Sequence, residues 1–155
     1  MAILDIVKAG NPVLKQKAAE IKKVDAKLRK LLTNMADTMY KADGVGLAAP
    51  QVGESIRCVV IDVNDEHGLL ELVNPVIVER QGTATDSEGC LSVPNVFGDV
   101  ERSSHVVAEY TNRWNKRKRI EADGLLARCI QHELDHLEGI LFIDVARSLR
   151  SGDKK

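Results

Sequence analysis

The sequence has no excess of charge of either sign and no long apolar run. Lys and Arg number 22 and Asp and Glu number 23, so the formal net charge is -1 at pH 7. A chain so balanced has no overall positive field to hold a polyanion, so no DNA partner is expected. No apolar segment approaches the roughly 20 residues that a membrane-spanning helix needs, so no membrane association is expected either.

The N-terminal residues also lack the features of a secretion signal. Residues 1–7 contain an early acid, no charged leading region and no extended apolar stretch. The chain has few cysteines, and their odd number of three, without such a signal, is typical of free thiols in a reducing compartment. The sequence therefore predicts a cytoplasmic protein.

The length and composition suit one domain. With 155 residues, of which 44% are hydrophobic and 29% charged, the chain is long enough to bury a core without cross-links. No repeat, linker or low-complexity segment divides it. We predict a single domain over residues 1–146 and a polar C-terminal tail over residues 147–155.

Hydrophobic periodicity predicts one long helix in the N-terminal half. Asp25 has the character of an N-cap, and the apolar residues after it recur at helical spacing: Leu28, Leu31, Leu32, Met35 and Met39. We predict an amphipathic helix over residues 25–42 whose apolar stripe packs in the core. Residues 3–7 are predicted as a short strand and residues 44–51 as a loop of small residues.

The rest of the chain has the patterns of strands followed by a second helix. Strands are predicted over residues 57–63, 69–79, 100–110 and 117–121, with an irregular segment over residues 95–99. The second helix opens at Asp123 and Gly124 and stops at Gly139. These elements predict an α+β fold, a compact domain of short antiparallel strands packed around the second helix.

The second helix carries the H-E-x-x-H pattern, as QHELDH over residues 131–136. Helical residues four apart project only about 40° apart, so His132 and His136 share one face and are able to bind one metal ion. Glu133, about 100° from His132, is placed to act as a base on a metal-bound water without being a ligand. The pattern predicts a central metal-binding helix.

Two histidines do not complete a catalytic metal site, which takes three protein ligands and one open position. Phe142 stands where a metzincin protease has its third His, and no Glu follows Glu138. The upstream candidates are the remaining histidines and cysteines: His67, His105, Cys58, Cys90 and Cys129. Cys90 follows a glycine that permits close approach, but a lone cysteine is more often structural. The residues alone leave the third ligand open, with Cys90 the leading candidate.

Three stretches together resemble the peptide deformylase family, in the same order and with the same spacing. They are GVGLAAPQ at residues 44–51, EGCLS at residues 88–92 and QHELDH at residues 131–136. The similarity extends to residues 3–12 and 122–125 and so covers nearly the whole chain. The absence of an insertion before Gly44 resembles the shorter bacterial type.

The resemblance implies a hydrolase that removes the formyl group from N-formylmethionine at the start of new polypeptides and releases formate. It implies metal ligation by Cys90, His132 and His136. Fe²⁺ is then the expected physiological ion, with Zn²⁺, Ni²⁺ or Co²⁺ able to take its place. Residues 1–146 would be the catalytic domain.

The resemblance also implies roles for other residues. Glu133 would move the proton of the attacking water, and the Gln51 side-chain amide and the Leu91 backbone N–H would hold the oxyanion. Glycines in two of the stretches would let a substrate strand lie against the backbone, as in β-strand addition. The implied substrate-binding residues are Val45, Gly46, Gly89, Leu125, Arg128 and Cys129.

Arg128 departs from the many relatives in which an apolar residue lines the methionine pocket at this place. Either its stem carries the guanidinium out to solvent, or the pocket is narrower and more polar than usual. Glu88, Arg102 and Asp135 also have two interpretations. They form either a charge network that orients the ligands or ordinary surface pairs.

Two other functions are weighed beside deformylation: an H-E-x-x-H metallopeptidase that cuts peptide bonds, and a non-catalytic metal-binding module. The missing downstream ligand disfavours the first, and the presence of every group needed for chemistry disfavours the second.

The expected partner is an N-formylmethionyl nascent polypeptide, and the protein is expected to be a monomer. Cations of the tail either contact the ribosome transiently or stay in solvent: Arg147, Arg150, Lys154 and Lys155.

Overall fold

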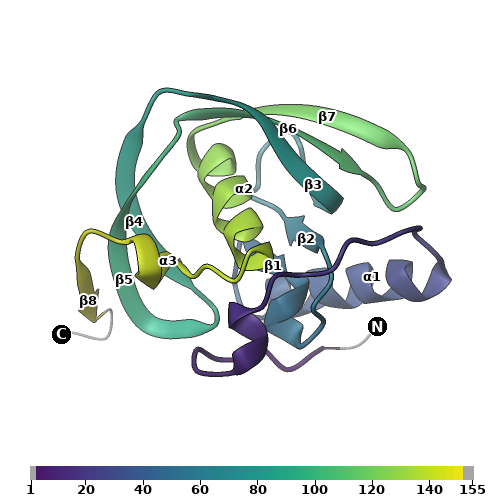
Figure 1. The fold of residues 1–155 in the computed structure, drawn as a ribbon, viewed down its shortest axis with the longest axis horizontal. Coiled ribbons are helices and arrows are strands. Elements are labelled where there is room, and N and C mark those ends of the chain that lie inside the picture. The colour runs from purple at the N-terminus through teal and green to yellow at the C-terminus, as the bar shows by residue number, and fades with distance from the viewer. Residues whose placement is uncertain (1–2, 152–155) are drawn as a thin grey trace.

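Two antiparallel sheets surround one central helix in the computed structural model of the protein, which describes residues 3–151 (Figure 1). The larger sheet has the strand order β1-β2-β3-β6-β7 and the smaller has the order β4-β5-β8. The strands are β1 (Gly46–Ala48), β2 (Cys58–Ile61), β3 (Leu70–Gln81), β4 (Ala84–Cys90), β5 (Val93–Arg102), β6 (His105–Thr111), β7 (Arg117–Asp123) and β8 (Leu149–Ser151). The helices are α1 (Ala26–Lys41), α2 (Gly124–Leu137) and the short α3 (Phe142–Val145), with 3-10 turns η1 (Pro12–Lys15) and η2 (Ala49–Val52). The predicted α+β class of antiparallel strands with few helices is confirmed.

Helix α1 begins where the predicted cap stands. The Asp25 carboxylate accepts a hydrogen bond from the Leu28 backbone N–H at 2.9 Å, which satisfies one of the free donors at the helix start. The apolar stripe is buried against β2, in a core cluster that includes Leu32, Met35 and Cys58. The observed helix differs from the predicted range 25–42 by one residue at each end.

Helix α2 runs through the middle of the molecule (Figure 1). Leu126, Ile130 and Leu137 pack in a core cluster with side chains of β2, β6 and β7. Ten of its 14 residues are buried, and they include polar ones. The face that carries the histidines therefore lies inside the protein, where side chains must find partners or a ligand.

Two predictions for the N-terminal half are wrong. Residues 3–7 form no strand; they run without regular structure, and the Val7 N–H donates to the Gln51 carbonyl at 2.7 Å. Residues 44–51, predicted as a loop, contain β1 and η2. The pairing of β1 with β2 rests on backbone hydrogen bonds, which small side chains permit but no side-chain periodicity reveals.

The predicted irregular segment 95–99 and the single strand 100–110 are also wrong. Residues 84–102 form the β4–β5 hairpin, and the chain then crosses at Ser103 and Ser104 to β6 in the larger sheet. Five of the seven residues of β4 are exposed and none is a large apolar residue, so the strand shows no hydrophobic alternation, and its backbone is satisfied by pairing with β5. Cys90 consequently stands at the end of a strand.

The segment predicted as a polar tail, residues 147–155, contains β8, which pairs with residues 96–98 of β5. Residues 152–155 of that segment, with Lys154 and Lys155, lie outside the described residues. Within residues 3–151, no helix combines the length and apolar character needed to cross a membrane.

Gly139 lies just after α2, and its backbone packs closely against Lys15 of η1. It has φ +78°, and a β-carbon there would lie 2.5 Å from the Lys15 carbonyl oxygen, whereas Gly53 has φ +87° with open space around it. We expect Gly139→Ala to lower the free energy of unfolding by about 3 kcal/mol and Gly53→Ala by about 1 kcal/mol. Urea unfolding measures both. Equal losses would show that the backbone contact at Gly139 relaxes at no cost.

Candidate metal centre and active site

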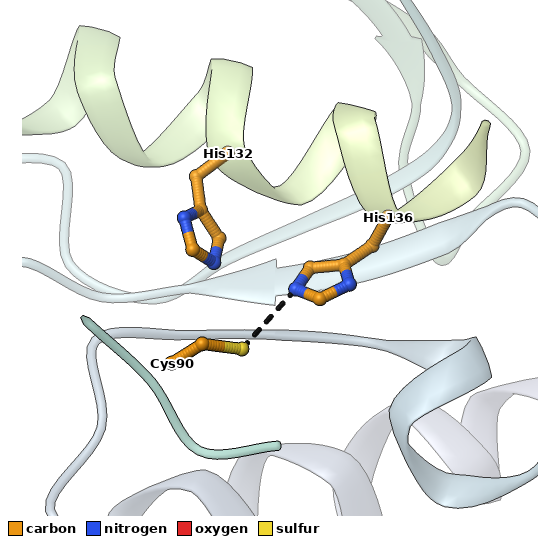
Figure 2. Close-up of side chains that lie close together, drawn as sticks. All are labelled: Cys90, His132 and His136. Carbon is orange, nitrogen blue, oxygen red and sulfur yellow. Dashed lines mark hydrogen bonds between the residues drawn. The ribbon is translucent and has the colours of Figure 1, made fainter. Parts of the chain in front are cut away.

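Three side chains from two elements meet between the sheets. His132 and His136 project from one face of α2, and Cys90 faces them from the end of β4 (Figure 2). The Cys90 Sγ lies 3.4 Å from His136 Nε2. The candidate ligand atoms of all three lie within 4.8 Å of one another. The fold thus brings Cys90 to the histidine pair.

The other candidates for a third ligand lie elsewhere or are chemically inert. Cys58 is buried in β2, and burial raises the pKa of its thiol to about 12. Cys129 is nearer, but burial raises its pKa to about 12 as well. His67 and His105 each pair with an aspartate in other parts of the fold.

Each imidazole of the pair has a distinct environment. His132 Nδ1 lies 3.0 Å from Glu88 Oε1, which leaves Nε2 for a metal ion. The His132 ring also stacks on Phe142, with centroids 6.2 Å apart. Burial lowers the pKa of His136 well below its usual value, so this imidazole is neutral, as a ligand must be. His136 Nδ1 has no hydrogen-bond partner in the described part of the chain.

The Glu88 carboxylate is the centre of a buried charge network. Arg102 donates to both of its oxygens, from Nε at 3.0 Å and from Nη2 at 2.9 Å, and its Nη1 contacts Asp135 at 2.5 Å. Burial alone would raise the pKa of Glu88, but the hydrogen bonds from His132 and Arg102 outweigh it and lower the pKa to about 2. Of the two interpretations of these residues, the network next to a histidine is the one that the structure has.

Arg128 joins the same network. Its Nη1 donates to Glu88 Oε2 at 2.7 Å and to the Val100 carbonyl at 2.9 Å, and its Nη2 donates to the Ala84 carbonyl at 2.8 Å. The side chain is 10% exposed, so the predicted alternative in which the guanidinium reaches solvent is wrong. Arg128 instead ties α2 to the β4–β5 hairpin.

The donor set suits a divalent metal ion. One thiolate, two imidazoles and an open position form the kind of site that catalytic zinc and other borderline metals occupy. Burial disfavours a charged His132, yet its hydrogen bonds with Cys90 and Glu88 prevail and raise its pKa to about 10. The negative groups around His132 therefore favour a positive charge at this place, and a metal ion would supply that charge while the imidazole loses its proton, as a ligand must. These residues fit the ion.

Glu133 lies beside the ligands, and no side chain among residues 3–151 forms a hydrogen bond with its carboxylate. It is 4% exposed, and its Oε1 has no hydrogen-bond partner within the described residues. Burial raises its pKa to about 7. Its Oε2 lies against Gly46 of β1, where a β-carbon would collide with it. A carboxylate with these properties is suited to accept and return a proton near neutral pH.

Gln51 of η2 lies against Cys90. Its Oε1 accepts from the Ala48 N–H at 2.9 Å, and its Nε2 donates to Cys90 Sγ at 3.4 Å and to Ser92 Oγ at 3.1 Å. Leu91 lies in the turn between β4 and β5. Ser92 was not among the predicted site residues, and its only signal in the sequence is its place in the EGCLS stretch.

A cavity of about 500 Å³ opens beside the ligands. Two sheet edges border it, because β1 ends the larger sheet and β4 ends the smaller one. It is lined by all six predicted substrate-binding residues: Val45, Gly46, Gly89, Leu125, Arg128 and Cys129. Phe97 of β5, which the sequence analysis placed in an irregular segment, also lines it and packs over Gly89. Phe97 reaches the cavity wall only because β4 and β5 pair as a hairpin.

A Cys-His-His cluster with a buried carboxylate beside an open cavity is typical of metal-dependent hydrolases. Residues 3–151 match the polypeptide deformylase family. A peptide deformylase of Desulfitobacterium hafniense is 54% identical over 147 residues, which cover 95% of this chain and 97% of that protein. One of Pelotomaculum thermopropionicum is 51% identical over 150 residues, which cover 97% and 96%.

Solved structures of peptide deformylases are also similar to this chain. The peptide deformylase of Thermotoga maritima aligns with a TM-score of 0.92 at 42% identity, covering 96% of this chain and all of that one (100%). The enzyme of Synechococcus elongatus, in complex with actinonin, aligns with a TM-score of 0.89 at 46% identity, covering 94% of this chain and 79% of that one. The chain belongs to the polypeptide deformylase family, whose members are metal-dependent hydrolases of protein biosynthesis. The family predicted from three sequence stretches is confirmed.

The tie between α2 and the hairpin predicts a large effect of removing the Arg128 guanidinium. In Arg128→Met, Glu88 loses one of its two arginine partners and the carbonyls of Val100 and Ala84 each lose a donor, so we expect the free energy of unfolding to fall by about 3 kcal/mol. The matched control is Arg119→Met, because Arg119 is half exposed and 3.6 Å from Glu109, and it should change stability by less than about 1 kcal/mol. Chemical denaturation compares the two, and similar losses would contradict the role of the buried network.

Proposed function

We propose that this chain is a metal-dependent peptide deformylase that holds one divalent ion on Cys90, His132 and His136. The observation that supports it most is the convergence of the three ligand atoms within 4.8 Å, next to the buried Glu133, whose Oε1 has no hydrogen-bond partner among the described residues. When bound, the ion supplies electrophilic catalysis, because it polarises a carbonyl and makes water more acidic. In this proposal α2 is the central metal-binding helix of the domain.

We further propose Fe²⁺ as the ion in the cell, with Zn²⁺, Ni²⁺ and Co²⁺ as substitutes. Thiolate and imidazole ligands accept all four ions, and the open position does not select among them. The choice in the cell then depends on availability and on protection from oxidation, to which a thiolate is sensitive.

The proposed substrate is the N-formylmethionyl end of a nascent polypeptide. An extended chain laid between β1 and β4 would continue both sheets through its backbone hydrogen bonds. Gly46 and Gly89 keep this path free of side chains. The methionine side chain would enter the cavity among Val45, Leu125, Arg128 and Cys129. Because the Glu88 carboxylate neutralises Arg128, this wall carries little free charge despite its guanidinium.

The protein groups then divide the chemistry. Glu133 accepts the proton of the attacking water and delivers it to the amine nitrogen as the C–N bond breaks, which yields formate and a free N-terminus. A pKa of about 7 suits both transfers. The Gln51 side-chain amide and the Leu91 backbone N–H donate to the oxyanion that forms in between. The Ala48 N–H holds Gln51 with its Nε2 toward Cys90.

The proposal also covers the domain, the oligomeric state and the contacts of the tail. We take residues 1–146 as one catalytic domain and the protein as a cytoplasmic monomer. Arg147 and Arg150 form ion pairs with Glu101 and Asp99. These pairs leave the two arginines less available for the transient contact with the ribosome that the tail was expected to make. Neither of the alternative functions, a metallopeptidase or a non-catalytic metal-binding module, has a specific observation in its favour.

The role of Glu133 can be separated from metal binding. Glu133→Gln keeps the shape of the side chain but removes the base, so formate release from formyl-Met-Ala-Ser should fall by about 10²-fold or more. Elemental analysis should still find about one ion per chain. Glu66→Gln, on an exposed turn, is the control. Unchanged turnover in Glu133→Gln would refute the assigned mechanism, and cleavage of casein by the unaltered protein would revive the metallopeptidase.

The identity of the third ligand is tested with two cysteines. After anaerobic purification, Cys90→Ser should bind metal at least about tenfold more weakly than the unaltered protein, because the thiolate is lost. Cys129→Ser should keep its metal, since its thiol is buried away from the ligand atoms. Metal content after dialysis against a chelator, followed by reloading with each of the four ions, measures this. Equal metal loss in both variants would count against Cys90.

A further inference from the structure

The charges of this chain are separated in sequence, although their sum is nearly zero. Residues 22–30 and 113–119 hold ten of the 22 Lys and Arg but only one of the 23 Asp and Glu. The rest of the chain holds the other 22 acids and only 12 bases. The absence of a positive field therefore describes the molecule as a whole and does not apply to this part of it.

The fold joins the two basic segments at one end of the molecule. In the turn between β6 and β7, the Asn115 side chain bonds the Val24 backbone in both directions, accepting from its N–H at 2.9 Å and donating to its carbonyl at 2.8 Å. Figure 1 shows this turn beside the start of α1, at the end opposite β4, β5 and β8. We call residues 22–30 and 113–119 together the Trp114 surface.

Most cations of the Trp114 surface have no acidic partner. Arg113 pairs with Glu71, and Arg119 lies 3.6 Å from Glu109. The single acid of the surface, Asp25, caps α1. Six exposed lysines form no ion pair with the described residues: Lys22, Lys23, Lys27, Lys30, Lys116 and Lys118. The surface consequently carries a concentrated positive charge facing solvent.

Trp114, the only tryptophan of the chain, stands among these cations. It is 63% exposed, although a large aromatic side chain normally gains by burial. The guanidinium carbon of Arg29 lies 5.3 Å from the indole centroid and that of Arg113 lies 5.9 Å from it. Cation–π contacts from both basic segments thus hold the ring in an exposed position. An exposed ring surrounded by cations is what proteins use to stack an unpaired base and contact its phosphates.

We propose that the Trp114 surface binds single-stranded RNA, with a base stacked on Trp114 and the surrounding lysines against phosphates. An acidic peptide would use the lysines but leave the ring without a partner. A membrane surface would require a larger apolar face than one indole. A duplex keeps its bases stacked inside and offers the ring none. This binding is separate from the catalytic cavity and does not depend on the proposed reaction.

The single tryptophan gives a local readout of this binding. We expect a 12-nucleotide single-stranded RNA, added to the full chain at low salt, to change the Trp114 fluorescence in a saturable way. The affinity should fall with salt, with a log–log slope of about -2 to -3 for three or four phosphate contacts. An RNA duplex of the same length and polyglutamate are the competitors, and both should displace the labelled single strand at least about tenfold less well.

Variants locate the surface. Lys30→Glu combined with Lys116→Glu, one substitution from each basic segment, should weaken binding of labelled RNA at least about tenfold, and Trp114→Ala should weaken it about fivefold or more. The matched control is Lys8→Glu combined with Lys41→Glu, two exposed lysines outside the surface, which should change affinity less than about threefold. Formate release and thermal unfolding should be unchanged in all. No binding at low salt, equal weakening in the control pair, or equal competition by polyglutamate would each overturn the proposal.

Discussion

The Glu88 carboxylate holds together parts of the protein that are far apart in the sequence. It stands on β4 and accepts hydrogen bonds from Arg102 of β5 and from Arg128 and His132 of α2. Removing one partner from such a buried cluster leaves a charge that the interior cannot solvate, so the members are retained as a set. The cluster therefore fixes the distance between the hairpin, which carries Cys90, and the helix, which carries both histidines.

This constraint also explains how α2 is able to bury a polar face. His132 and Arg128 are satisfied by the network, and the packed leucines on the other face supply the apolar burial. Two atoms of α2 are exceptions, because Glu133 Oε1 and His136 Nδ1 find no hydrogen-bond partner among the described residues. Such unsatisfied buried groups are unfavourable for folding alone, and Glu133 lies where the proposed reaction needs a base. The close approach of Gly46 keeps space for it.

The distribution of charge divides the molecule into two functional ends. Beside the cavity, Glu88 and Asp135 balance the charges of Arg102 and Arg128, so two guanidinium groups leave little free positive charge there. At the Trp114 surface the lysines are left without acids, and the rest of the chain carries the compensating negative charge. A net charge near zero therefore conceals a strong separation of sign, which matters for partners larger than a few residues.

Local patterns were enough to determine several features from the sequence by itself. The helix behind Asp25 and the helix with His132 and His136 follow from periodicity, because contacts between residues three or four apart are set by the helix itself. The family followed from three short stretches in order. Predicting the third ligand from the residues alone left alternatives, because no local rule relates Cys90 to His136, which is 46 residues further along the chain.

Only the tertiary structure decided the features that depend on pairing between distant segments. β1 and β4 have weak side-chain patterns and exist because a neighbouring strand satisfies their backbone. The buried position of the Arg128 guanidinium depends on carbonyls of that hairpin, so neither its charge nor its side-chain flexibility foretold it. The Trp114 surface likewise arises because Asn115 joins a turn to a segment about 90 residues earlier. In each case the stabilising contact joins segments that are far apart in the sequence, so it exists only in the folded chain.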